Sequence, residues 1–271
     1  MLANGGAADQ YDEYLRIAES TSLDCMGRFC AVVILRFDTE IVQWHGTKHT
    51  LELIRGSRST IILEAVASQD LWIWHAFFGT PGANNDINVL NSSTLFHDQL
   101  EGRAPPVTFQ VNNSFYQKGY YLTNGIYPNW PMFVKSPTHH IDEKSKRFKV
   151  MQEAARKDIE RAFGVLQAQW AIIKGPVCLW SKAEFSDIMF TCIILHNMIV
   201  QDEGDHAIKW ADESNDEASS SSAAARPHRG APPEFRQYVA REASIRDAEM
   251  HARLTLDLKE HIWSRFGPVD H

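Results

Sequence analysis

The segment STIILEAVASQDLWIWHAFFG, residues 59–79, decides the fold class of this chain. It consists of two runs rich in β-branched and aromatic residues, STIILEAVAS and LWIWHAFFG, with Gln69-Asp70 between them. Two such runs separated by a two-residue turn predict an antiparallel β-hairpin. The middle of the chain is therefore predicted to build a sheet.

Further strands and two long helices accompany this hairpin. Residues 107–117, VTFQVNNSFYQ, predict a small hairpin around Asn112-Asn113, and the runs YYLTNG and MFVKSP predict two more strands. Helical patterns cover roughly residues 144–170 and 182–200, and the second is apolar almost all round, which indicates deep burial. Strands combined with long covering helices predict an α/β fold, a mixed sheet flanked by helices.

The N-terminal residues 11–37 allow two interpretations. Leu23, Met26, Phe29, Cys30 and Val33 recur at helical spacing, which favours a helix. The run AVVILRF, residues 31–37, is equally typical of a buried strand, because periodicity alone does not separate the two.

The C-terminal part divides into a linker and a final helix. Residues 211–232 are acidic, then rich in Ser and Ala, then rich in Pro and Gly, a composition that cannot bury a core. We therefore predict a disordered linker over residues 206–232 and one amphipathic helix over residues 233–267.

Composition places the chain among intracellular proteins that are not secreted. Its 271 residues are 44% hydrophobic and 23% charged, it shows no signal peptide and no membrane-spanning run, and its four cysteines lack CxxC spacing. The net charge is −7, whereas proteins that bind nucleic acid alone usually carry a basic surplus. If the protein binds DNA, we expect a partner protein to supply much of the affinity for DNA.

Polar side chains at strand ends and on a helix are the candidate site residues. Asp86 follows the second strand of the hairpin, Asn124 ends a later strand, and Glu160 lies in the long helix. Carboxylates from separate elements can hold Mg²⁺ or Mn²⁺ and activate water against a phosphodiester. Each residue also has a simpler interpretation: a helix cap for Asp86, a hairpin turn for Asn124-Gly125 and an exposed acid for Glu160.

Four long motifs follow one another along the chain: ILEAVASQDLWIWHAFFGTPGANNDINVLNSSTLF, GYYLTNGIYPNWPMFVK, RKDIERAFGVLQAQWAII and CIILHNMIVQDE. Together and in this order they resemble plant transposase-derived proteins of the PIF/Harbinger group. The resemblance covers roughly residues 11–38 and 57–203 and the final helix. It implies a DDE nuclease domain with an RNase H-like fold over residues 59–205, after an N-terminal helical region and truncated junction over residues 1–58.

The resemblance also assigns roles to the candidate residues. The family's acid after Pro-Gly matches Asp86, and its helical glutamate in an R-x-x-x-E pattern matches Glu160, with Arg156 as the arginine. A second catalytic aspartate normally precedes Gly-Ile-Tyr-Pro, where this chain has Asn124. Asparagine keeps a ligating oxygen but loses the charge that attracts Mg²⁺ or Mn²⁺.

The family's first aspartate has no clear counterpart. Asp24 lies in a similar segment, Ser-Leu-Asp-Cys-Met, but its flanks resemble an upstream helical region. We therefore predict an internal deletion within residues 38–58, so that the fold lacks or replaces its first central strand. The alternative is that AVVILRF forms this strand and Asp38 substitutes for the acid.

Two functions follow from the resemblance. One is a metal-dependent nuclease by descent, whose hydrolysis of DNA is impaired or lost. The other is a non-catalytic domesticated transposase that acts as a nuclear protein-interaction module. In both, the resemblance implies a nuclear location, with the cytoplasm also open, and DNA contact through a separate Myb-like DNA-binding protein.

Three histidines are interpreted without a catalytic role. His45 and His49 have the spacing of a metal pair but lack the glutamate of HExxH. His196, in the apolar helix, is predicted to be a hydrogen-bonded core histidine.

Overall fold

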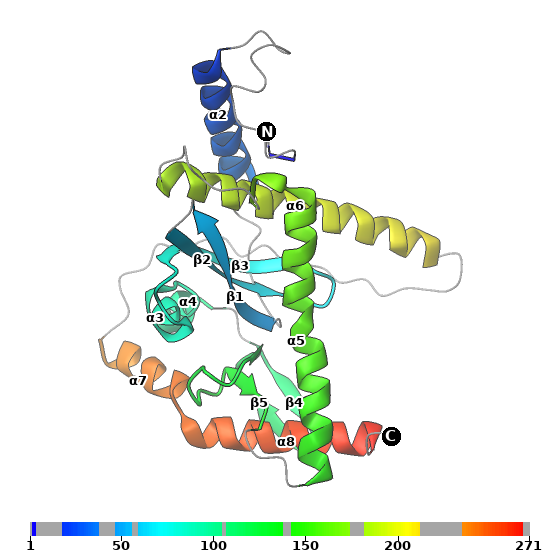
Figure 1. The fold of residues 1–271 in the computed structure, drawn as a ribbon. Helices are drawn as coiled ribbons and strands as arrows, with labels where there is room; N and C mark the ends of the chain where they lie inside the picture. The colour runs from blue at the N-terminus through cyan, green and yellow to red at the C-terminus, as the bar shows by residue number, and fades with distance from the viewer. Residues whose placement is uncertain are drawn as a thin grey trace.

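The computed structural model describes residues 2–3, 18–37, 47–55, 59–104, 107–137, 142–173, 182–211 and 235–267. Its helices are α2 (Glu19–Phe37), α3 (Asp86–Ser92), α4 (His97–Glu101), α5 (Glu143–Gln169), η3 (Ala171–Ile173), α6 (Lys182–Ala211), α7 (Phe235–Ile245) and α8 (Ala248–Phe266) (Figure 1). Its strands are β1 (Thr47–Arg55), β2 (Ser59–Ala67), β3 (Ile73–Pro81), β4 (Phe109–Val111), β5 (Ser114–Tyr116), β6 (Tyr121–Thr123) and β7 (Phe133–Lys135).

The main sheet is mixed and has the strand order β3-β2-β1-β6-β7. β2 pairs with β3 in an antiparallel register, which confirms the predicted hairpin, and β1 pairs antiparallel with β2. β6 runs parallel to β1 and β7 runs parallel to β6. The small predicted hairpin is also confirmed, because β4 and β5 form a second sheet around Asn112-Asn113. The α/β class therefore holds.

The central strand comes from a segment that the sequence did not identify as a strand. Residues 47–55 form β1, although they belong to the junction from which the first strand was expected to be missing. AVVILRF does not fill the gap: this alternative is wrong, because these residues lie in α2. The helix prevails because its spacing places Met26, Cys30 and Val33 on one buried face. Residues 47–55 therefore occupy the centre of the main sheet.

One face of the sheet packs on the two long helices. Alternate residues of β2, Ile61, Leu63 and Ala65, are buried there, as the two-residue period of a strand requires. The facing residues of α5 and α6 include Ile159, Phe163, Leu166, Phe185, Met189 and Cys192. The two predicted long helices are thus confirmed, and they meet near the C-terminal end of α5 (Figure 1).

Helix α6 is apolar enough, from Ala183 to Gly204, to cross a membrane by length and hydropathy. Half of that stretch is buried inside the protein, and its apolar side chains belong to the core. His196 lies among them as predicted: its Nε2–H donates to the carbonyl of Leu71 at 2.9 Å, and Nδ1 lies 2.8 Å from the side-chain amide of Gln169. Burial lowers the pKa of His196, which makes it a neutral structural residue.

The other face of the sheet is covered by α3, α4 and the chain between β6 and β7. The buried cluster on this face consists of Val66, Leu90, Leu95, Phe96, Tyr121, Tyr127, Met132, Phe133 and, from α7, Ile245. Phe96 has ring contacts with Tyr121, Trp130 and Phe133, so aromatic packing holds α4 to the ends of β6 and β7.

The single C-terminal helix predicted over residues 233–267 is wrong, because two helices are present. The chain breaks between α7 and α8, where Asp247 caps α8 by accepting the backbone N–H groups of Glu249 and Met250. Of the predicted linker, residues 206–211 continue α6, and the rest lies outside the described residues.

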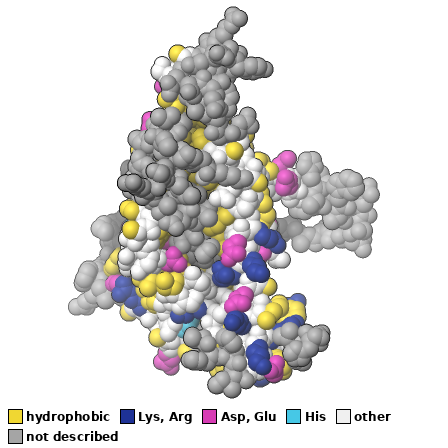
Figure 2. Space-filling view, viewed as in Figure 1, with side chains coloured by type: hydrophobic (Ala, Val, Ile, Leu, Met, Phe, Trp, Pro, Cys, Tyr) yellow, Lys and Arg dark blue, Asp and Glu magenta, His cyan; other side chains and the backbone are white. Residues whose placement is uncertain are grey.

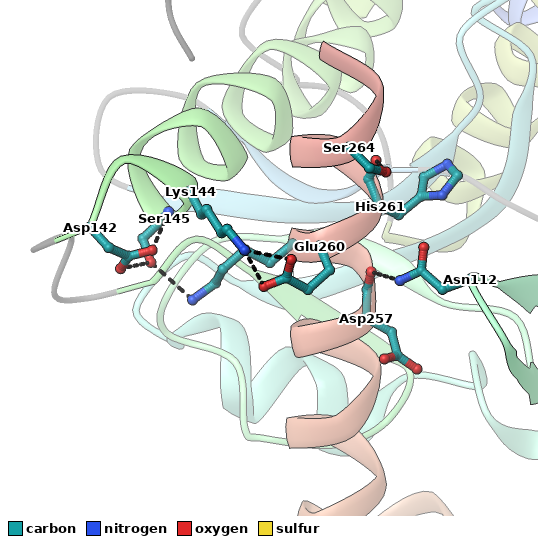
Figure 3. A network of polar contacts seen from close by, with 9 residues as sticks. Asn112, Asp142, Lys144, Ser145, Asp257, Glu260, His261 and Ser264 are labelled. Carbon is teal, nitrogen blue, oxygen red and sulfur yellow. Dashed lines mark hydrogen bonds and ion pairs between the residues drawn. The ribbon is translucent and has the colours of Figure 1, made fainter. Parts of the chain in front are cut away.

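Helix α8 is held against the start of α5 by polar contacts (Figure 3). Lys144 bonds both carboxylate oxygens of Glu260 at 2.8 and 2.6 Å, and Lys259 donates to Ser145 at 2.9 Å. Asp142 caps α5 through the backbone N–H of Ser145 at 3.0 Å. Through these contacts α8 lies across the N-terminal end of α5, at the bottom of the view in Figure 1.

Candidate functional site

The structure brings Asp86 and Asn124 together. Asp86 is the first residue of α3, whose N-cap is Asn85, and Asn124 directly follows β6. The Asn124 amide Nδ2 donates to Asp86 Oδ2 at 3.3 Å, and both side chains are half-buried. Asn124 Oδ1 accepts the backbone N–H of Ile126 at 3.2 Å. The amide oxygen of Asn124 therefore stabilises the turn, and its amide nitrogen bonds the Asp86 carboxylate.

Gln152 fixes the strand end from which Asn124 extends. Its Nε2 donates to the carbonyl of Thr123 at 2.9 Å and to that of Val134 at 3.2 Å, at the ends of β6 and β7. Its Oε1 accepts the hydroxyl of Ser136 at 2.7 Å. Sequence reasoning missed this residue, although a glutamine on the inner face of α5 was a visible signal.

A second missed residue is Glu64, a fully buried carboxylate in the middle of β2. The Ser93 hydroxyl donates to Glu64 Oε1 at 2.5 Å, and His75 Nε2 lies 3.4 Å from the same oxygen. Burial, together with the charges of Asp86 and Glu64, raises the pKa of Tyr127. The charges of two acids therefore raise the pKa of one buried tyrosine.

Glu160 lies eight residues after Gln152 on α5, and its side chain is 46% exposed. Its Oε1 forms an i,i+4 ion pair with Arg156 at 3.0 Å, so the R-x-x-x-E pattern appears here as a helix-surface pair. Asp24, the other acid weighed from the sequence, is on α2, exposed and paired with Arg28 at 3.0 Å. Asp38, His45 and the side chain of His49 lie outside the described residues.

Of the metal centre that the resemblance implies, the described residues show Asp86 and Asn124 in contact. Within the described part of the chain, no three His, Cys, Asp or Glu side chains gather to hold a metal ion. Asp86 contributes one carboxylate, while the oxygen of Asn124 accepts the Ile126 N–H and its nitrogen faces Asp86. A Mg²⁺ site uses carboxylate oxygens, and this pair presents an amide N–H to its carboxylate.

The exposed face of α5 carries both signs of charge. Along α5, Lys146 pairs with Glu143, Lys149 with Glu153 and Arg161 with Asp158. Figure 2 shows basic and acidic side chains interspersed on the visible face. Mixed charge of this kind does not concentrate a field that would attract a phosphate backbone.

Comparison with known proteins places the sequence beside transposon proteins. A family model described as plant transposon protein matches residues 4–207. "Protein ALP1-like" of Arabidopsis thaliana is 24% identical over 153 residues, which cover 53% of this chain and 36% of that protein. The match thus spans little more than a third of that relative's length. No solved structure matches.

Proposed function

The chain belongs to the plant transposon protein family, and we propose that it is a nuclease-derived protein that has lost its own DNA cleavage and acts as an interaction module. The resemblance to transposase-derived proteins is confirmed by the family match. The observation that carries the proposed loss is the hydrogen bond between Asn124 and Asp86.

The strand order supports descent from an RNase H-like nuclease. Such a sheet has its first strand at the centre, and β1 is the third of five strands here, antiparallel to β2 and parallel to β6. Asn124 directly follows β6, the strand next to β1. The resemblance places a catalytic acid at this strand end. The strand order thus agrees with an RNase H-like sheet, although position 124 carries an asparagine where the resemblance expects an acid.

The chemistry of the site supports loss of cleavage. Hydrolysis of a phosphodiester by Mg²⁺ or Mn²⁺ requires several oxygen ligands that hold the ion and activate water. In this protein Asn124 donates to Asp86, and Glu160 pairs with Arg156 on the surface of α5. In this arrangement these side chains do not present together the oxygen ligands that the ion requires.

The charge distribution supports a role that depends on partners. The net charge of −7 and the mixed charges along α5 disfavour autonomous DNA binding. We therefore propose that the protein reaches DNA through a Myb-like DNA-binding partner in the nucleus.

The test is calorimetric titration of the full-length protein with Mn²⁺, together with a plasmid-nicking assay in Mg²⁺ and Mn²⁺. We expect no binding and no nicking by the wild-type protein. Binding by wild-type protein that Glu160→Ala abolishes would mean that a usable centre survives, and the proposal would be wrong.

An Asn124→Asp variant locates the defect. Mn²⁺ binding by this variant alone would assign the loss to position 124. If the variant also fails to bind, the replaced first strand has removed a further ligand. Circular dichroism of each variant checks that it is folded, so that a misfolded protein is not scored as a failed site.

A further inference from the structure

The break between α7 and α8 creates a cavity that the candidate site does not use. The cavity has a volume of about 380 Å³ and lies between β5 and the α7–α8 corner. Its lining includes Phe115, Lys118, Ser244, Asp247, Met250 and Leu254. This volume falls in the range of ligand pockets, about 300–1,000 Å³.

Its apolar wall is open to solvent at the rim. The side chain of Phe115 is 69% exposed and that of Met250 is 38% exposed, whereas Leu254 is buried in the wall. Large apolar side chains exposed around a hollow lose contact with water when another apolar group enters, which favours binding. The wall therefore suits a bulky apolar side chain.

Its polar side offers a cation. Lys118 is the single cation among the described residues that line the cavity, and its ammonium group contacts the Ser244 hydroxyl. Burial lowers the pKa of Lys118, because surrounding protein atoms displace water from the ammonium group, and the negative charge of Asp247 partly offsets this shift. Asp247, the lining acid, already accepts two backbone N–H groups at the start of α8. An ammonium group has three N–H donors, so a carboxylate from outside can accept a hydrogen bond beside the one that Ser244 accepts.

The neighbouring strand suits an extended peptide. Asn112-Asn113 is a two-residue turn, and Val111 and Ser114 are the pair that closes it. Hydrogen-bonded and non-hydrogen-bonded pairs alternate in an antiparallel ladder. Because Val111 and Ser114 form the hydrogen-bonded pair that closes the turn, Gln110 and Phe115 form the next, non-hydrogen-bonded pair. The N–H and C=O of Phe115 therefore point away from β4. An extended chain passing β5 can bond there while its side chains reach the cavity.

We propose that this cavity is a docking site for a short partner segment in which a bulky apolar side chain lies next to a carboxylate. The apolar side chain packs between Phe115 and Leu254, and the carboxylate bonds to Lys118. This proposal rests on the interaction role proposed above and specifies the chemistry of the partner.

The experiment measures fluorescence anisotropy of a fluorescein-labelled peptide, Gly-Ser-Thr-Phe-Asp-Ser-Gly, with the full-length protein. A matched peptide replaces its aspartate with asparagine. We expect wild-type protein to prefer the aspartate peptide by about tenfold, the scale of one charge-assisted hydrogen bond. Lys118→Met should remove this preference, and Phe115→Ser should weaken binding of both peptides.

Leu35→Ser is the control, because Leu35 is an exposed apolar residue of α2, and it should change nothing. Equal binding of the two peptides to wild-type protein, unchanged binding by Phe115→Ser, or no binding of either peptide at millimolar protein would overturn the proposal. These results do not depend on metal or cleavage, so failure here is distinct from failure of the proposed loss of nuclease activity.

Discussion

Replacing Asn124 with aspartate should destabilise the folded protein by an amount that the structure allows us to estimate. The variant loses the hydrogen bond to Asp86, and a bond to a charged group contributes about 1.5–3 kcal/mol. It also places two carboxylates at the 3.3 Å separation of the present pair, where repulsion reaches about 5 kcal/mol at an effective dielectric constant of 20. Both side chains are only partly buried, so solvent screens part of this repulsion.

We expect a net loss of about 2–4 kcal/mol near neutral pH, or roughly 10 °C in Tm. Two adjacent carboxylates bind a shared proton more tightly than separate ones do. The folded variant therefore takes up this proton at a higher pH than the unfolded chain. The penalty is consequently present at neutral pH and fades as pH falls toward about 4, the ordinary aspartate value.

The assay is urea denaturation followed by far-UV circular dichroism, in EDTA, from acid to neutral pH. The matched control is the exchange Asp86→Asn with Asn124→Asp, which restores one carboxylate and one amide. It should recover all but about 1 kcal/mol, the contribution of an acid at a helix N-terminus. A variant as stable as wild type at neutral pH, or an exchanged pair no more stable than Asn124→Asp alone, would refute the reasoning.

Three further predictions concern the supporting residues. Gln152→Leu leaves the carbonyls at the ends of β6 and β7 without their donor and should cost about 2–4 kcal/mol in urea denaturation, whereas an exposed substitution such as Val150→Ser should cost little. Because burial lowers the pKa of His196 in the folded state, stability should fall as pH drops through about 6.5, and His196→Gln should show a smaller fall. Peptide mapping of aged protein should find Asn124 deamidated through attack by the following backbone nitrogen. Gly125→Ala should slow this reaction without strain, since a Cβ at this position meets no atom within 4 Å, and an equal rate would contradict the mechanism.

Local sequence was sufficient for the elements whose signal is contained in their own residues. The β2–β3 hairpin carries its turn between two apolar runs, and α5 and α6 carry long helical patterns, so all were predictable. Asn124 was recognised as unusual because a motif surrounds it, but its contact with Asp86 links positions 38 residues apart in the chain.

The central strand was not predictable in this way. The segment TKHTLELIR has little alternation of its own, and its place is set by pairing with β2 on one side and β6 on the other. The break before α8 did have a local signal, since Asp247 is a strong N-cap residue, but the amphipathic pattern on both sides masked it. Glu64 was visible as a lone acid in an apolar strand, and only the structure supplies its partner, Ser93.

The asparagine at position 124 also accounts for an edge of the sheet that is stable without a metal ion. Two carboxylates at this edge would repel each other unless a cation or a proton lay between them. The Nδ2–H group of Asn124 supplies a positive dipole to Asp86 instead, and its oxygen still bonds the Ile126 N–H that shapes the turn. Asparagine at this position therefore removes the electrostatic need for a cation while preserving the geometry, and the loss of cleavage that we propose would follow from the same residue.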